Sequence, residues 1–263
     1  MLFFFMTHYR FFIFLFLLFT ESSLAQNKKT VDSVQSILNK ESQDTTTVNC
    51  FIQLGSEYKN NEPKKAMGFA NKALELSQKL KFKQGIANSY HLLGMINSNL
   101  SNNDKAMDSY MLSLKINEEL GNKKQMSTTY NNIGSIYYYQ SNYDKALKYY
   151  LISLEIDESL NEQKGMASSY NNVGLIFWAQ NNLDKAQDYF QKAVTIYSKL
   201  NDKNGLGGVY SNIGGVAYYK GEIEVSILYF KKSYEFYKEI NYKPGCAVSL
   251  INISEIYTAK KIF

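Results

Sequence analysis

Residues 130–153 read YNNIGSIYYYQSNYDKALKYYLIS, and forty residues later the chain reads YNNVGLIFWAQNNLDKAQDYFQKA. The same spacing separates the members of three sets: Tyr90, Tyr130, Tyr170 and Tyr210; Gly94, Gly134, Gly174 and Gly214; and the Asp-Lys-Ala triplets that begin at Asp104, Asp144 and Asp184. A fixed period of this length is typical of stacked supersecondary units, none of which can bury its apolar face alone. We therefore expect an elongated array with an extended surface, which suits binding better than catalysis.

Each unit is expected to be a pair of antiparallel helices. In the unit quoted first, one helix runs through residues 130–137, a break follows at 141–143, and a second helix starts near Asp144. Apolar residues recur at intervals of three and four, which is the helical period. Asp144 suits a helix N-terminus because a carboxylate there accepts backbone N–H groups and meets the positive end of the helix dipole. We expect Gly134 and Ala146 to face each other, so that the two backbones approach closely.

The periodic residues divide the chain into parts. The expected organisation is a signal peptide over 1–25, a short helix and polar linker over 26–47, and an array over 48–263, with units near 48–83, 84–123, 124–163, 164–203 and 204–243 and a partial unit at 244–263. The expected fold class is all-α, a right-handed superhelical solenoid of five helix pairs followed by an unpaired final helix. That helix carries Ile253, Ile256, Tyr257, Ile262 and Phe263, whose apolar surface favours a covering partner or self-association.

The first 25 residues are expected to be an export signal. Arg10 precedes the uninterrupted apolar run 11–19, and Ser23 and Ala25 stand at the spacing that a signal peptidase requires, which predicts cleavage before Gln26. An uncleaved membrane anchor is the alternative, although the apolar run is short for crossing about 30 Å of hydrocarbon. The chain is therefore expected to be periplasmic or extracellular.

Composition argues against several functional classes. The net charge is +5, from 29 basic and 24 acidic residues, and no run of five Lys or Arg residues stands out. This mixture argues against a nucleic-acid partner, which would need a concentrated basic stripe. Cys50 and Cys246 lie near opposite ends of the expected array, so we expect free thiols. The two cysteines and two histidines cannot make a structural zinc site, because His8 lies in the signal segment and only three of these four residues remain. We expect no metal and no cofactor.

Two sets of residues carry a resemblance to a known family: Tyr130, Ile133, Gly134, Tyr137, Ala146 and Tyr150, and then Tyr170, Val173, Gly174, Phe177, Ala186, Phe190 and Ala193. They resemble the tetratricopeptide repeat (TPR) family, in a long variant whose unit exceeds the common 34 residues by six. The usual proline near the end of the unit is missing. The resemblance covers residues 48–260 and implies that the first helix of each pair lines the concave face of a superhelix.

A narrower resemblance concerns the order of the parts. A signal peptide, residues 44–46 leading into 51–55, and then forty-residue repeats are similar to the extracytoplasmic sensor region of bacterial TPR-containing histidine kinases. In that family a transmembrane helix and a catalytic region follow, and related architectures carry cyclase domains. No phosphoacceptor motif, Gly-rich ATP lid or second apolar span occurs after residue 26. The resemblance implies a sensory or scaffold input module. The alternatives are a fragment of a signalling enzyme, either a histidine kinase or a cyclase, and a self-associating structural protein.

One polar position recurs in the expected first helices, as Asn132, Asn172, Asn212 and Asn252. An asparagine side chain offers a donor and an acceptor, which suits the backbone of an extended peptide. The resemblance implies that this position contacts the ligand in peptide-binding members, although Leu92 departs from it in the second unit. Hydrogen bonding between helices is the alternative role. The neighbours expected to line the same concave face are Asn131, Asn171, Ser135, Tyr138, Trp178 and Tyr218.

Catalysis has little support in the sequence. His91 is the only histidine after the signal segment, and we expect it to be solvated or to line the groove. The paired acids Glu118-Glu119 and Asp157-Glu158 are expected to be solvated as well. No Gly-rich phosphate loop, Ser/His/Asp set or metal-spaced cluster occurs. The chain is therefore expected to bind a protein or peptide and not to be an enzyme.

Overall fold

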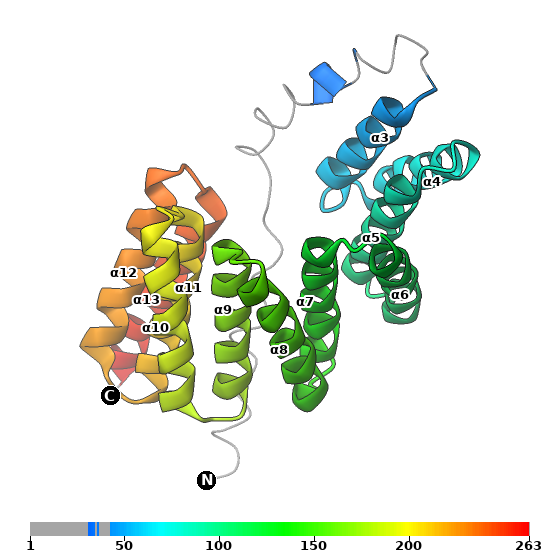
Figure 1. Ribbon diagram of the computed structural model, residues 1–263. Coiled ribbons are helices and arrows are strands. Elements are labelled where there is room, and N and C mark those ends of the chain that lie inside the picture. Colours follow the sequence, from blue (N-terminus) through cyan, green and yellow to red (C-terminus); the bar gives the residue numbers. More distant parts are fainter. Residues whose placement is uncertain (1–30, 35, 37–42, 263) are drawn as a thin grey trace.

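The computed structural model describes residues 31–34, 36 and 43–262 of the chain. All regular secondary structure in these residues is α-helical (Figure 1): α3 (Thr45–Tyr58), α4 (Pro63–Lys79), α5 (Lys83–Asn99), α6 (Asn103–Glu119), α7 (Lys123–Tyr139), α8 (Tyr143–Ser159), α9 (Gln163–Ala179), α10 (Leu183–Lys199), α11 (Lys203–Tyr219), α12 (Ile223–Glu239) and α13 (Lys243–Ile262). We call α3, α5, α7, α9, α11 and α13 the first helices and the others the second helices. The expected all-α solenoid of five helix pairs with a final unpaired helix is confirmed.

The breaks from the end of α4 onward share one geometry, which explains the regular period. Each of them contains a residue in the left-handed region, such as Ser141 (φ 58°), Asn161 (φ 53°) or Gly221 (φ 78°), whereas the break between α3 and α4 contains none. Glycine and asparagine adopt this region most readily, and it ends a helix tightly. The N-cap of α8 is Asn142, whose Oδ1 accepts a hydrogen bond from the backbone N–H of Lys145 at 3.3 Å.

This cap corrects the role expected for one aspartate. Asp144 lies in the first turn of α8, two residues after the cap, and not at the cap itself. Its negative charge still meets the positive end of the helix dipole. An asparagine caps α10 in the same way, where Asn182 Oδ1 accepts a hydrogen bond from the backbone N–H of Lys185.

The periodic glycines make room for aromatic rings. A Cβ atom added at Gly134 would lie 2.7 Å from the ring of Tyr150, and one at Gly174 would lie 2.6 Å from the ring of Phe190. The ring of Tyr150 on α8 therefore lies directly against Gly134. Ala146 is fully buried, and the equivalent pairs Gly55–Ala66 and Gly214–Ser226 are in contact, as the expected facing of the two small residues requires. The ring sits one helical turn beyond the alanine because the aromatic side chain reaches across to the first helix.

The N-terminal part of the array begins earlier than the sequence suggests. Asp44 caps α3 by accepting the backbone N–H of Thr47 at 3.0 Å, so the helix includes residues assigned to the linker. Residues 31–34 and 36 are also helical, and Val34 packs against Cys50 and Leu54. Cys50 and Cys246 are both free cysteines. The expected signal peptide lies outside the described residues.

The last helix is partly covered by the unit before it. Ile256 is 4% exposed and packs in a cluster with Ile227 and Phe230 of α12. The expectation that Ile256 adds to an open apolar surface is therefore wrong. Tyr257 is exposed and Ile253 is half-buried, as a first helix without a second helix beside it should be. The side chains of residues 262 and 263 lie outside the described part of the chain.

Candidate functional site

The first helices line the inner side of the array. Each first helix from α3 to α11 contacts the first helix of the next unit as well as its own second helix, whereas among the described residues no second helix contacts another second helix. A stack of helix pairs whose helices lie closer together on one side than on the other curves toward that side. Figure 1 shows the pairs arranged as a curved row from α3 to α13. The first helices therefore form its inner face.

Helical geometry selects the residues of that face. On α7 they are Thr128, Asn131, Asn132, Ser135 and Tyr139, which lie on the side opposite the ring of Tyr137 that packs on α8. Position 138 borders this set and is included, because its equivalent Trp178 packs over Gly215 of α11. We use the name inner face for these positions and for their equivalents forty residues away: 88, 91, 92, 95, 98 and 99 on α5; 168, 171, 172, 175, 178 and 179 on α9; and 208, 211, 212, 215, 218 and 219 on α11.

The repeated asparagines of the inner face hydrogen-bond to one another across units. Asn172 Nδ2 donates to Asn131 Oδ1 at 3.0 Å, and Asn212 Nδ2 donates to Asn171 Oδ1 at 2.8 Å. In the earlier unit, Asn132 Nδ2 lies 3.4 Å from His91 Nε2. These contacts give the amides a structural role between first helices. Their contact with a ligand backbone stays a prediction.

The remaining polar positions extend the same network. Asn131 Nδ2 donates to Ser169 Oγ at 3.3 Å. Ser135 Oγ accepts a hydrogen bond from the hydroxyl of Tyr150 at 3.2 Å and donates one to the backbone carbonyl of Asn131 at 3.2 Å. Asn252 occupies the equivalent place on α13 and is half-buried. The structure shows that Asn131, Ser135 and Asn172 are held by hydrogen bonds to neighbouring residues, and their role in ligand binding stays a prediction.

Aromatic side chains gather where the first helices end. Trp178 of α9 is half-buried and packs edge-to-face on Tyr219 of α11, with ring centroids 6.0 Å apart. Gly215 makes this possible, because a Cβ atom there would collide with the indole ring. Tyr219 also packs edge-to-face against Tyr218. The single tryptophan of the chain thus bridges two units on the inner face.

A second aromatic group lies one unit earlier. Tyr138 packs against Tyr139 and Tyr143, with ring centroids 5.6 Å and 5.9 Å away. The side chain of Tyr139 is 75% exposed, a large fraction for a ring of this size. Aromatic rings with a polar tip are common anchors of protein interfaces. The two aromatic groups therefore mark the inner face of α7, α9 and α11 as the candidate site.

Sequence reasoning missed Tyr139 and Tyr143. Tyr139 follows Asn132 by seven residues, which is two helical turns, so the same periodicity places it on the same face. This spacing could have predicted that Tyr139 lies on the inner face. Tyr143 belongs to the second helix α8, and only the turn at 140–142 brings it beside Tyr138.

The expectation for His91 is wrong in part. The residue stands on the inner face, but its side chain is buried, lies against Tyr110, and makes a 3.0 Å contact between Nδ1 and Thr129 Oγ1. Burial lowers the pKa of His91 to about 4, so the imidazole is neutral at pH 7. It therefore acts as an uncharged partner for the asparagine network.

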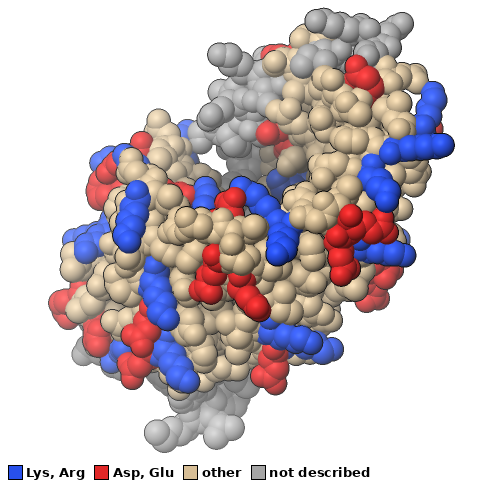
Figure 2. Space-filling view, in the orientation of Figure 1, with Lys and Arg blue, Asp and Glu red and all other residues tan. Residues whose placement is uncertain are grey.

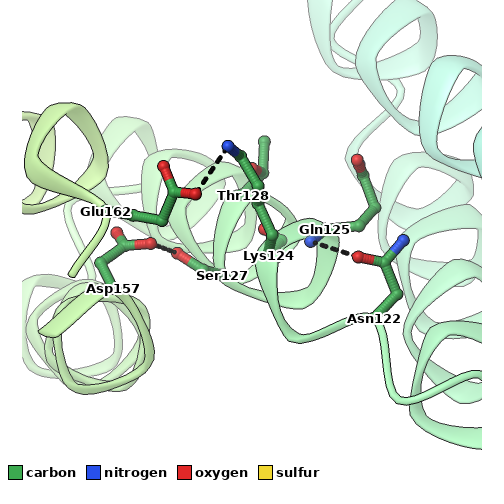
Figure 3. Close-up of polar contacts among 7 residues, drawn as sticks. All are labelled: Asn122, Lys124, Gln125, Ser127, Thr128, Asp157 and Glu162. Atoms are coloured by element: carbon green, nitrogen blue, oxygen red, sulfur yellow. Dashed lines mark hydrogen bonds and ion pairs between the residues drawn. The ribbon is translucent and has the colours of Figure 1, made fainter. Parts of the chain in front are cut away.

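The expectation that Asp157 is solvated is also wrong. The side chain is 4% exposed, and Oδ1 accepts a short hydrogen bond of 2.6 Å from Ser127 Oγ, as Figure 3 shows. Burial raises the pKa of Asp157, and the nearby carboxylate of Glu162 acts in the same direction. Glu162 is itself paired with Lys124 at 2.7 Å. At forty-residue spacing, Asn117 and Tyr197 occupy the same position, and neither is charged. Uncharged residues at the equivalent positions could have indicated that Asp157 is buried.

Replacing Asp157 by Asn is expected to stabilise the protein at neutral pH. A carboxyl group whose pKa is raised by folding is less stable in its ionised form in the folded chain than in the unfolded chain. The ionised group therefore opposes folding above the folded-state pKa, and this effect disappears as pH falls. Asparagine keeps an acceptor oxygen for the hydroxyl of Ser127 without the charge, and the equivalent site in α6 already holds a buried asparagine, Asn117. We expect the free energy of unfolding at pH 7 to rise by about 1 kcal/mol.

Urea unfolding at pH 7 and at lower pH checks this prediction. The difference between Asp157→Asn and the parent chain should shrink as pH approaches about 4, where a model aspartate titrates. Glu155→Gln, at an exposed position of the same helix, is the control and should change stability little. A parent chain that is more stable than Asp157→Asn at pH 7 would contradict the account.

The charged residues are spread over the molecule in mixed groups. Figure 2 shows basic and acidic side chains beside one another over the visible face, separated by uncharged surface. None of the described helices combines the length and apolar character needed to cross a membrane. Within the same residues, no group of three His, Cys, Asp or Glu side chains is placed to hold a metal ion.

A depression of about 450 Å³ lies between α9 and α10, away from the inner face. Its walls include Phe177, Tyr189 and Lys192, and the ammonium group of Lys192 lies 4.7 Å from the centroid of the Tyr189 ring. Lys185 lies 5.2 Å from the centroid of the Phe177 ring. Because lysines of the same chain cover these rings, we assign the depression to packing between helices.

Comparisons with known proteins agree with this architecture. Residues 125–199 and 87–120 match two family models, each described as Tetratricopeptide repeat. No curated protein is similar enough in sequence to count as a match. Among solved structures, BtubC from P. vanneervenii is 22% identical with a TM-score of 0.64, over 84% of this chain and 93% of that one.

Two further solved structures are similar in fold. A Rap protein complexed with competence and sporulation factor is 13% identical with a TM-score of 0.65, over 89% of this chain and 72% of that one. NprR in complex with its cognate peptide NprX is 14% identical with a TM-score of 0.69, over 85% of this chain and 65% of that one. At these identities the similarity shows the fold alone.

Proposed function

We propose that this chain, whose residues 87–120 and 125–199 match tetratricopeptide repeat models, binds a protein or an extended peptide along the inner face of its solenoid. The observation that carries this proposal is the exposure of large aromatic rings there, 75% for Tyr139 and 44% for Tyr219. Such rings, next to amide and hydroxyl groups, can supply packing area and orient a bound chain. The inner face is also continuous over several units, as an extended ligand requires.

Solved proteins of the same fold give a second line of support. The Rap protein and NprR are both similar to this chain in fold, and they were solved in complex with competence and sporulation factor and with the cognate peptide NprX, respectively. A shared fold does not fix the ligand, so the identity of the partner depends on the residues of this inner face.

Selection from a displayed peptide library on the full chain tests the proposal. Tyr219→Ala removes an exposed ring from the inner face and is expected to weaken binding of the recovered peptides by about tenfold. Leu228→Ala is the matched control, because Leu228 is 52% exposed on α12 of the same unit and faces away from the first helices. Equal losses in the two variants, or no loss in Tyr219→Ala, would contradict binding at the inner face.

We further propose that the chain is exported and forms the sensory or scaffold input part of a bacterial signalling protein. The apolar N-terminal run and the order of the parts support this role. Mass spectrometry of the chain recovered from the periplasm or medium should find Gln26 as the first residue. The signalling role predicts a catalytic region in the reading frame after residue 263 or on a partner chain, and the absence of both would argue against it.

Self-association is a second candidate function, favoured by one observation. Leu250 is 51% exposed and Tyr257 is 48% exposed, on the face of α13 where a second helix packs in every other unit. Light scattering over a concentration series tests this candidate. A monomer at all concentrations would remove it.

A further inference from the structure

The inner face is built from stretches of chain without charge. Residues 84–99, 125–139, 165–179 and 205–219 contain no Asp, Glu, Lys or Arg. At the overall charged fraction of 20%, these 61 residues would hold about twelve charged side chains. His91 is the one titratable imidazole among them, and burial keeps it neutral at pH 7. The first helices of four successive units therefore present an uncharged surface.

The second helices of the same units show that this is not a property of the whole chain. The charged residues of α8 alone are Asp144, Lys145, Lys148, Glu155, Asp157 and Glu158. Both kinds of helix are 17 residues long and come from one repeated unit, so base composition and helix propensity act equally on both. The difference follows the side of the array and not the sequence position.

Several charges at the two ends of the first helices are paired with one another. At the edge where the first helices begin, Lys124 pairs with Glu162, and Lys164 pairs with Asp202, each at 2.7 Å. At the opposite edge, Lys220 pairs with Asp184 at 2.7 Å. Each pair joins one positive and one negative group, so these pairs add no net charge beside the uncharged surface.

We infer that the inner face of α7, α9 and α11 takes an extended peptide whose side chains are uncharged over the segment it covers. A charged side chain placed there would lose its water and find no opposite charge. Uncharged polar side chains and backbone amides can instead pair with the asparagine and serine groups, and apolar side chains can pack on the rings of Tyr139, Trp178 and Tyr219. This inference rests on the proposed function, because it names the class of ligand for the same surface.

The library selection on the full chain tests this inference through the composition of the recovered peptides. We expect Asp, Glu, Lys and Arg together to be depleted about fivefold in the central residues, relative to the input library. An unchanged charged fraction would overturn the inference and leave peptide binding intact. Recovery no better than with Tyr219→Ala would overturn the proposed function as well. Binding to an array of neutral oligosaccharides, with no peptide recovered, would overturn the peptide as the occupant.

A designed charge gives a second test. Tyr139→Lys places a positive charge at the exposed end of α7, where a lysine is compatible with the helix dipole. Tyr139→Gln removes the same ring without adding charge. Peptides with one central Glu should bind Tyr139→Lys about tenfold more tightly than Tyr139→Gln. Equal affinities for the two variants would show that neutrality of the inner face does not set its selectivity.

Salt dependence separates this surface from a charged one. Affinity of a recovered neutral peptide, with both ends capped, should change less than about twofold between 0.05 M and 0.5 M salt for the parent chain. A decrease of tenfold or more would mean that charge pairing drives binding, which contradicts the inference.

Discussion

Phe190→Ala is expected to lower the free energy of unfolding by about 3–5 kcal/mol. The ring of Phe190 is fully buried against Gly174 and belongs to a cluster that includes Ala186 and Val209. Gly174 has no side chain that could fill the space, so the cavity left by alanine cannot collapse. The loss therefore combines lost burial with an unfilled cavity.

The position of Phe190 in the stack adds a second signature. In a solenoid each unit is stabilised by its neighbours, so weakening the fourth unit uncouples those on either side. Urea unfolding followed by circular dichroism should show a lower midpoint and a broader transition. Asp188→Ala, at an exposed site on the same helix, is the control and should change stability by less than about 0.5 kcal/mol. A loss below about 1 kcal/mol for Phe190→Ala would contradict the packing described.

Trp178→Ala is expected to weaken binding of the recovered peptides by about thirtyfold, which corresponds to about 2 kcal/mol. Trp178 lies between two first helices and packs on Tyr219, so it combines a large ring with a position in the middle of the inner face. Buried aromatic anchors near the centre of an interface usually carry much of its binding free energy.

Two measurements separate this effect from a loss of structure. Trp178→Phe keeps a ring over Gly215 and should lose less than about fivefold in affinity. Circular dichroism should show the same helicity for both variants and the parent chain. Unchanged peptide affinity in Trp178→Ala would place the ligand elsewhere.

Much of the fold follows from the sequence because its causes are local and repeated. The forty-residue recurrence of Gly134 and Tyr130 is enough to give the helix pairs and their number. The contact of Gly134 with the ring of Tyr150 could not be derived in the same way. It depends on how far the Tyr150 ring reaches across the helix interface, which is a property of packing and not of spacing.

The site was predictable only in part. Periodicity places Asn132 and Asn172 on one face, but their bonds run to residues 41 positions earlier, and these depend on the rotation between units. The burial of His91 and Asp157 also depends on how the helices pack. His91 contacts Thr129 of the next first helix, and Asp157 accepts a hydrogen bond from Ser127 of its own first helix. Sequence spacing therefore did not predict these contacts between helices.

The most direct measurement of the central claim uses the single tryptophan of the chain, Trp178. Because it lies on the inner face, its fluorescence should report occupation of that face alone. Titration of the full chain with a capped, uncharged peptide from the selection should give a saturable change in emission, with a dissociation constant equal to that from an independent binding assay. Binding in the independent assay without any change in Trp178 emission would contradict a ligand seated on the inner face.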